Sequence, residues 1–437
     1  MVLGEVVLGR RAFAGARDAW SSLRHEPWLA VAVVASCLAL FDAVVRLSTR
    51  NLVTVVPAFL ALGLVALHRA GVRPSALRTP LDLAVGAGLA AGGVAFVVNG
   101  LHGGRRLVEC AVLVAAFYLF VGVQRAWAHG RTALALTGAL AVGIAAATAV
   151  AQWVTGADTG YCRAEIVGGA DSCQRGDAAV RAVGTLSNPN LLAPVLVLLV
   201  PVGCVALRAV LGRRRGRVAA ASLGVLGAAA VATTLSRGGL VSLGALGVAA
   251  LALRYPSRRT LVGAGLAVGA GVVVAFGALL ARFSIGPRAD VYRESLGLVR
   301  EHVWGVGLGR SGPFIDARVP GDQRFYHSHN LWLTWLVEAG TAGLAATLWL
   351  TLAVVLVVVR GARRGDALVV AAGCGLAGFA VISLFDNPAF RQSVAVPLWA
   401  VVAIAVAREA VPRRGEDEPG AAGQFESRAR DAGRGRG

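Results

Sequence analysis

Long apolar stretches dominate this chain, and polar residues cluster in the segments between them. The clearest apolar stretches cover residues 132–154, 191–207, 260–280 and 331–359. An α-helix needs roughly 20 apolar residues to cross about 30 Å of hydrocarbon, so these stretches have the lengths of membrane spans. The pattern predicts an all-α protein that is a polytopic transmembrane helical bundle.

The same pattern predicts about twelve transmembrane helices. We expect them at about 28–45, 52–67, 81–98, 107–123, 132–154, 191–210, 218–235, 240–253, 260–280, 331–359, 367–384 and 394–407. Two long connections remain between these helices, at about 155–190 and 281–330. Long loops in a tightly wound membrane protein are commonly functional, so the chemistry is expected there.

Composition supports the assignment to a membrane. Hydrophobic residues make up 56% of the 437-residue chain, charged residues only 15%, and the mean hydropathy is +0.67. A soluble protein with so few charges would leave its surface largely apolar. These values exclude an ordinary soluble protein and make the lipid bilayer a partner of the chain.

The arginines predict the orientation of the bundle. The formal net charge is +19, and all 43 basic residues are arginine. Such a charge in a soluble domain would suggest nucleic acid, but here sixteen arginines lie in the short connections on one side and six on the other. By the positive-inside rule, we expect a multi-pass cell-membrane protein with both termini in the cytoplasm, both long loops outside it, and no nucleic-acid partner.

Three regions follow from this topology. Residues 1–27 form a basic cytoplasmic segment without a cleavable signal peptide, and residues 28–407 form the transmembrane domain. Residues 408–437 are rich in Gly, Arg and Glu and poor in apolar residues, which predicts a disordered cytoplasmic tail.

Two of the six cysteines lie in one polar loop. Cys162 and Cys173 both fall in the first long connection, whereas the other four lie singly in apolar stretches. A disulfide between Cys162 and Cys173 is plausible if the loop faces an oxidising compartment. Two unpaired thiols are the alternative.

The first long loop and a later hairpin carry polar residues suited to an anionic ligand. Asn188 and Asn190 stand where they can cap the helix that begins near residue 191. Arg237 interrupts a largely apolar stretch of two helices, in a tight turn that ends in Gly238 and Gly239. An arginine at that surface can bind a phosphate through two parallel hydrogen bonds, although snorkelling to the interface would also explain it.

The second long loop predicts an amphipathic helix followed by a glycine-rich turn. The helix runs from Arg288 to about His302, and the turn covers 304–310. No strand precedes this turn, which excludes a nucleotide-binding motif.

Two histidines, His327 and His329, end the second loop. They could be metal ligands, but no Cys lies nearby and the carboxylates are scattered, so we predict no metal and no other cofactor. They could also simply solvate the interface. An imidazole titrates near neutral pH and can take a proton from a sugar hydroxyl, and this is the interpretation we favour.

Taken in order, these segments resemble the superfamily of O-antigen ligases and Wzy-type polysaccharide polymerases. The resemblance covers about residues 181–343. It consists of Gly-Thr-Leu-Ser-Asn-Pro-Asn at 184–190, Leu-Ser-Arg-Gly-Gly at 235–239, Arg288 with Tyr292 one helical turn later, Trp-Gly-Val-Gly-Leu-Gly at 304–309, His-Asn-Leu-Trp-Leu at 329–333, and Glu-Ala-Gly-Thr-Ala-Gly-Leu at 338–344.

The resemblance implies a membrane glycosyltransferase with a GT-C-like fold. It would move a glycan from an undecaprenyl diphosphate carrier to a glycan, lipid or protein acceptor on the extracytoplasmic face, without a metal, in cell-surface polysaccharide biosynthesis. By the same resemblance, Arg237 and Arg288 would bind the diphosphate and His329 would be the catalytic residue. Supporting roles fall to four further residues: Arg181, Asn190, Tyr292 and His327.

Two alternatives stay open. A Wzy-type polymerase would extend the glycan itself instead of passing it to a different acceptor. A twelve-helix secondary transporter or flippase is the alternative from another functional class. Transporters usually show repeated halves and ionisable residues near the middle of the membrane. This sequence shows no repeat, and its acids, Glu338 among them, do not lie clearly at the middle of a predicted span.

Overall fold

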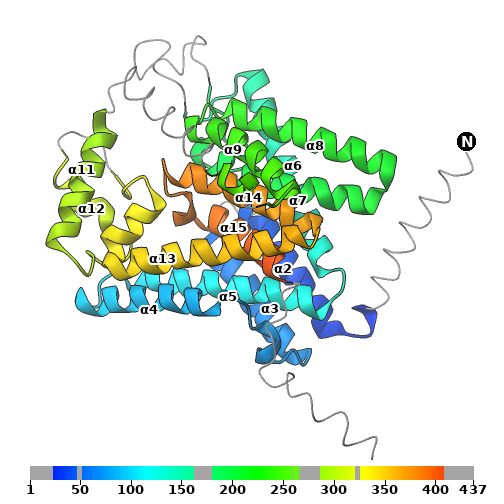
Figure 1. Ribbon diagram of the computed structural model, residues 1–437, viewed down its shortest axis with the longest axis horizontal. Coiled ribbons are helices and arrows are strands. Elements are labelled where there is room, and N and C mark those ends of the chain that lie inside the picture. The colour runs from blue at the N-terminus through cyan, green and yellow to red at the C-terminus, as the bar shows by residue number, and fades with distance from the viewer. Residues whose placement is uncertain are drawn as a thin grey trace, which may run out of the picture.

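A computed structural model describes residues 23–46, 52–161, 180–257, 259–263, 265, 286–319 and 325–407. Within these ranges the secondary structure is helical and contains no strand. The fold is thus the predicted polytopic helical bundle (Figure 1).

Long apolar helices make up the bundle. They are α2 (Pro27–Val45), α3 (Leu52–Arg69), α4 (Asp82–Val98), α5 (Gly104–Ala126), α6 (Gly130–Thr155), α7 (Pro189–Leu211), α8 (Arg213–Thr233), α9 (Arg237–Arg254), α13 (Leu331–Arg363), α14 (Ala367–Ser383) and α15 (Gln392–Val406). Two shorter helices, α11 (Gly286–Glu301) and α12 (Ser311–Asp316), and two 3-10 helices, η1 (Pro74–Leu77) and η4 (Pro388–Phe390), lie between them.

The helices agree with the predicted spans. Seven of them are long and apolar enough to cross a membrane, and four shorter apolar helices accompany them. Each predicted span except the ninth therefore coincides with a helix, and the ninth, at 260–280, lies largely outside the described residues. The chain is a multi-pass membrane protein.

Successive helices run in opposite directions, so their connections gather at two ends. At one end, Thr185 Oγ1 donates to the carbonyl of Val44 over 2.6 Å. At the other end, Arg125 Nη1 donates to the carbonyl of Arg78 over 2.6 Å, and Arg131 Nη1 lies 2.8 Å from Asp366. We call the end that carries α11, α12 and the connections 234–236 and 384–391 the loop end (left in Figure 1).

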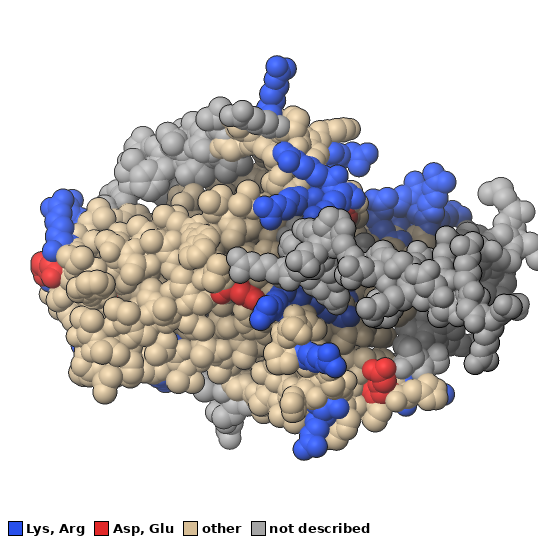
Figure 2. Space-filling view, turned by 60° about the horizontal axis from the view of Figure 1, so that its bottom comes forward, with Lys and Arg blue, Asp and Glu red and all other residues tan. Residues whose placement is uncertain are grey.

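Charged side chains are distributed unevenly over the bundle. Figure 2 shows a broad face with almost no charged side chains, and most of the arginines on this view lie to the right, away from the loop end. An uncharged belt between two polar ends is the surface that a bilayer requires.

Helix α13 is broken near its loop end, a feature that its apolar sequence did not predict. Gly340 has φ 67° and ψ −163° inside the helix. The glycine-rich turn at 303–309 pairs with the exposed backbone groups, because Val306 N–H donates to Val337 O over 2.8 Å and Gly307 N–H donates to Glu338 O over 3.0 Å. This pairing satisfies the peptide groups that the break releases.

Glu338 fastens the same turn to α13. Its side chain is buried, Oε2 accepts the Gly309 N–H over 2.8 Å, and Oε1 accepts the Ser311 hydroxyl over 2.6 Å. Glu338, which the sequence places two turns into a long predicted helix, therefore has a structural role in holding the turn against α13.

The break predicts a specific sensitivity at Gly340. A Cβ atom there would overlap the carbonyl oxygen of Val303, and the positive φ is unfavourable for any other residue. We expect Gly340→Ala to lower the free energy of unfolding by about 1–3 kcal/mol and to lower the melting temperature in detergent. Gly93→Ala in α4, where a Cβ meets no atom within 4 Å, is the matched control and should not lower it. Equal melting temperatures for the two variants would contradict the assignment.

Candidate functional site

Two histidines and an aspartate meet at the loop end. Nδ1 of His329 lies 3.4 Å from Oδ1 of Asp386, and Nε2 of His327 lies 3.6 Å from the same oxygen. The two imidazole centroids are 4.8 Å apart. His327 and His329 precede α13, whereas Asp386 lies between α14 and α15, so the fold joins residues more than fifty positions apart.

The backbone around His329 is held in an unusual conformation. His329 has φ 51°, a left-handed value that is uncommon outside glycine. The Tyr292 hydroxyl of α11 donates to the His329 carbonyl over 3.1 Å. Asn330 caps α13, because its Oδ1 accepts the Leu333 N–H over 2.9 Å, and its Nδ2 donates to Leu384 O over 3.1 Å. These contacts fix His329 against the segment that carries Asp386.

Hydrogen bonds distinguish the two imidazoles. Nδ1 of His327 accepts the backbone N–H of His329 over 3.1 Å, so a neutral His327 carries its proton on Nε2, toward Asp386. Nδ1 of His329 lies 3.4 Å from Oδ1 of Asp386 and has no hydrogen-bond partner among the described residues. A proton on Nδ1 would leave Nε2 of His329 as the unprotonated, basic nitrogen.

The shifts in pKa agree with this arrangement. The pKa of His327 is lowered to about 4, mainly by burial; Asp386 opposes this effect, and the charges of His329, Arg391 and Arg106 add to it. Burial alone would raise the pKa of Asp386, but the interaction with His329 and the nearby imidazole charges outweigh it and lower that pKa below its usual value. His327 is therefore neutral and Asp386 ionised near neutral pH.

The same three side chains have the composition of a small metal site. One ligand atom from each of His327, His329 and Asp386 lies within 4.8 Å of the others. Imidazole and carboxylate groups suit zinc and similar ions. The geometry thus permits either a bound metal ion or a carboxylate–imidazole pair.

Arg237 reaches the loop end from α9. The sequence placed it in the hairpin, but it is the first residue of α9, and Ser236 caps that helix by accepting the Gly239 N–H over 3.2 Å. Gly238 packs against Ile382 and Phe385, the segment immediately before Asp386. The partly exposed Arg237 is therefore carried on a helix whose first turn adjoins the histidine site.

Arg181 and Asn190 support the start of α9 and α7. Nε of Arg181 donates to Thr234 O and its Nη2 donates to Asn190 Oδ1, both over 2.9 Å. Asn188, and not Asn190, caps α7, because its Oδ1 accepts the Asn190 N–H over 2.8 Å. Arg181 thus ties the loop before α7 to the turn before Arg237.

Arg288 belongs to the first turn of α11, one helical turn before Tyr292. This confirms the predicted helix, while the Arg288 side chain lies outside the described part of the structure. Cys162 and Cys173 also lie outside it.

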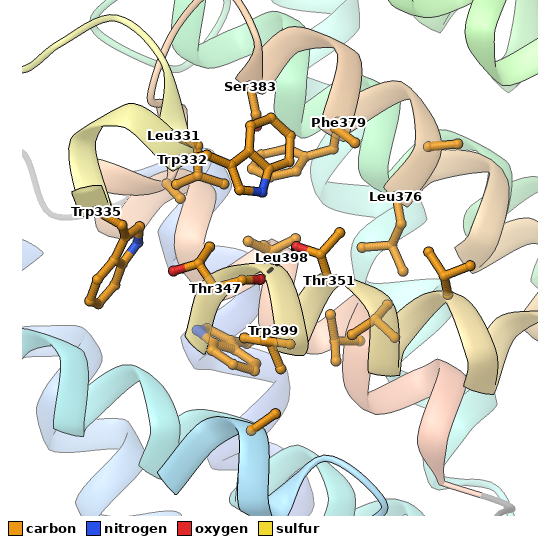
Figure 3. A pocket seen from close by; sticks show the side chains of 18 of the residues that line it. Leu331, Trp332, Trp335, Thr347, Thr351, Leu376, Phe379, Ser383, Leu398 and Trp399 are labelled. Atoms are coloured by element: carbon orange, nitrogen blue, oxygen red, sulfur yellow. Dashed lines mark hydrogen bonds between the residues drawn. The ribbon is translucent and has the colours of Figure 1, made fainter. Parts of the chain in front are cut away.

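An apolar cavity of about 630 Å³ lies among α4, α5, α9, α13, α14 and α15. Its wall at the loop end includes Trp332, Trp335 and Asn387, and Arg106 contributes a cationic side chain. Figure 3 shows Trp332, Phe379 and Ser383 grouped along one wall, with the Trp332 nitrogen directed toward Thr347 and Thr351. Because Asn387 follows Asp386 directly, the cavity begins beside the histidine site.

Sequence reasoning missed Asp386 and Arg106. Asp386 stands in the short connection 384–391. On the sequence alone, this connection is used only for its Arg391, which counts toward the orientation of the bundle in the membrane. Alternation of the predicted helices puts this connection on the same side as His329, so a search for carboxylates on that side would have found it. Arg106 follows two glycines at the start of α5, in a region without a recognisable motif.

The pKa of His327 predicts a loss of stability in acid. An unfolded chain binds the His327 proton below about pH 6.5, whereas the folded chain binds it only near pH 4. The contribution of neutral His327 to the free energy of unfolding should therefore be fully present above pH 6.5. The free energy of unfolding should decrease as the pH falls toward 4, by about 2 kcal/mol at about pH 5. Melting temperatures at both pH values should show this decrease in the wild type and much less of it in His327→Gln. The exposed His102 gives the control His102→Gln, which should behave as the wild type. Equal pH dependence in all three proteins would contradict the assignment.

Comparison with known proteins supports one family. No curated protein matches the sequence at a significant level. Residues 221–348 match the sequence profile of a family described as O-antigen ligase. The matched segment contains Arg237, Arg288, Tyr292, His327 and His329, whereas Asp386, Arg106, Arg181 and Asn190 lie outside it. Together with the helical bundle, this match supports the resemblance to the O-antigen ligase and Wzy-type superfamily: the chain is a multi-pass membrane protein in which residues 221–348 are similar to the O-antigen ligase family.

Proposed function

We propose that the protein transfers a glycan from an undecaprenyl diphosphate carrier to an acceptor hydroxyl at the loop end of the bundle. The observation that carries this proposal is the contact of His329 with Asp386 beside the first turn of α9. It joins a base and an arginine-bearing helix from the segment that matches the O-antigen ligase family with a carboxylate, Asp386, that follows this segment in the chain.

His329 is the general base in this proposal. Asp386 orients the imidazole and stabilises the imidazolium that forms, as a carboxylate does in other carboxylate–imidazole pairs. Nε2 takes the proton of the acceptor hydroxyl while the acceptor oxygen attacks the anomeric carbon. His327 is less suited to this role, because its Nδ1 already accepts a hydrogen bond and its pKa is near 4.

The leaving group is the lipid diphosphate. The bond between the anomeric carbon and the diphosphate oxygen breaks as the new glycosidic bond forms, and negative charge grows on that oxygen. Guanidinium groups stabilise such charge through paired hydrogen bonds, which is the role proposed for Arg237 and Arg288. The adjoining apolar cavity has the character needed for part of a polyprenyl chain.

The orientation of the bundle follows from the arginine distribution. We propose that the loop end faces outward from the cell membrane and that both termini are cytoplasmic, because the opposite end carries most of the arginines in short connections. The acceptor would then be a cell-surface glycan, lipid or protein.

Reconstitution with an undecaprenyl diphosphate-linked oligosaccharide tests the proposed reaction. His329→Ala should lower the transfer rate at least about a hundredfold, because general base catalysis contributes at least that much. Arg237→Ala and Arg288→Ala should each lower it about tenfold or more, through weaker stabilisation of the diphosphate. Arg293→Ala is the matched control, since this arginine of α11 is 75% exposed and should be dispensable. Retention of transfer in His329→Ala and in both arginine variants would refute the mechanism.

Asp386→Asn separates orientation from donor binding. An amide preserves the size of the side chain but cannot stabilise an imidazolium, so kcat should fall at least about tenfold while the KM for the donor stays within about twofold. An unchanged kcat would show that Asp386 does not assist His329.

Metal removal and product length resolve the remaining alternatives. We expect full transfer activity in EDTA, because the proposed reaction uses His329 as a base and not as a metal ligand. If EDTA abolishes transfer and zinc restores it, the cluster of His327, His329 and Asp386 is a metal site instead. A ligase gives one product length per donor, whereas a polymerase gives a ladder of products.

A further inference from the structure

The cavity has a polar wall at its loop end. Three side-chain atoms on this wall are buried without a hydrogen-bond partner among the described residues: Trp332 Nε1, Ser383 Oγ and Asn387 Oδ1. Buried polar atoms are nearly always paired in folded proteins, and these three would be costly to leave unpaired in an apolar cavity. A polar ligand group at this wall would supply the partners that these atoms lack.

Arg106 brings a positive charge to the same cavity. Its side chain is only 16% exposed, and Nη1 donates to Glu109 Oε2 over 2.8 Å and to Phe390 O over 3.0 Å. Within the described structure its Nε and Nη2 groups make no hydrogen bond. Glu109 is shared with Arg105, so this carboxylate balances only one of the two guanidinium charges. Glu338, which also lines the cavity, accepts from Gly309 and Ser311.

Arg106 also adjoins the histidine site through Phe390. Its guanidinium carbon lies 4.5 Å from the centroid of the Phe390 ring, and the His327 centroid lies 5.7 Å from the same ring. A group bound by Arg106 would therefore lie near the position at which the proposed reaction occurs.

The rest of the cavity wall is largely apolar, with Thr334, Thr347 and Thr351 of α13 among its few polar residues. It follows α13 away from the loop end past Leu350 and Val358 and is completed by Leu376 and Leu398. A ligand that fits the whole cavity has a hydrocarbon chain and a polar head with several acceptor atoms. Arg106, Trp332 and Ser383 all offer donors, and a phosphate is the head group that accepts from all three. A phosphate would balance the guanidinium charge that the shared Glu109 leaves over, which a neutral head group would not do.

We propose that Arg106, Trp332 and Ser383 bind a phosphate of a polyprenyl lipid whose chain occupies the cavity. The identity of the lipid rests on the proposed function, whereas the phosphate site rests on the cavity itself. The inference adds a cation from α5, outside the segment that matches the O-antigen ligase family, to the arginines of α9 and α11.

Binding of undecaprenyl phosphate to the detergent-purified full chain tests the phosphate site. Affinities can be measured by native mass spectrometry, with undecaprenol as the probe that lacks the phosphate. We expect Arg106→Gln to weaken binding of undecaprenyl phosphate about tenfold or more and to leave binding of undecaprenol unchanged. Arg105→Gln is the matched control, because Arg105 contacts the same Glu109 but is 79% exposed and lies outside the cavity wall; it should bind both lipids as the wild type does.

Variants that change less of the side chain distinguish a loss of binding from misfolding. Trp332→Phe and Ser383→Ala each remove one donor, so each should weaken undecaprenyl phosphate binding about threefold to tenfold at an unchanged melting temperature. Arg106→Lys keeps the charge and should lose less affinity than Arg106→Gln. Equal effects of Arg106→Gln and Arg105→Gln, or equal affinity of the wild type for undecaprenol and undecaprenyl phosphate, would overturn the proposal.

Two further arms identify the source of the phosphate and separate this proposal from the proposed function. If phosphatidylglycerol competes as well as undecaprenyl phosphate with the same dependence on Arg106, the phosphate site stands and its assignment to a polyprenyl lipid is overturned. His329→Ala should bind undecaprenyl phosphate as the wild type does. Arg106-dependent binding without any glycan transfer would refute the proposed function alone, and transfer without Arg106-dependent binding would refute this inference alone.

Discussion

Every unpaired peptide group or charge in the hydrocarbon interior of a bilayer costs free energy. This constraint decides where the chain can carry chemistry. Helix α13 illustrates it. The break at Gly340 is possible because the turn at 303–309 supplies N–H partners to Val337 O and Glu338 O, and because the Glu338 carboxylate accepts from Gly309 and Ser311. That arrangement fixes the start of α13, and with it His329, at the loop end of the bundle.

The site is assembled from elements that are distant in sequence. Tyr292 of α11 donates to the His329 carbonyl, Asn330 binds the end of α14 through Leu384 O, and Asp386 stands two residues after Leu384. Arg181 and Ser236 position the start of α9. Apart from the side-chain contact of His329 with Asp386, these contacts act on backbone geometry, so the imidazole that we propose as the base is oriented by a network in which few members would touch a substrate. Substitutions in that network should therefore affect rate more than affinity.

Much of this fold is predictable from the sequence, because apolar length and arginine asymmetry are local properties of a chain in a bilayer. The bundle, the helix beginning near Arg288 and the glycine-rich turn at 304–309 were all expected. The start of α9 was misplaced by a few residues, because Arg237 reads as part of a turn although Ser236 already caps the helix. The break in α13, the approach of Asp386 to His329 and the partial burial of Arg106 depend on tertiary contacts, and no local pattern encodes them.

The central claim is that His329 faces the anomeric carbon of a polyprenyl diphosphate-linked glycan. A cryo-electron microscopy structure of the His329→Ala variant with that donor would test it most directly. The account predicts the diphosphate beside Arg237 and the start of α11, the anomeric carbon facing the position vacated by the imidazole, and the beginning of the lipid chain in the cavity along α13. A donor bound elsewhere on the bundle, with its diphosphate remote from Asp386, would contradict the account.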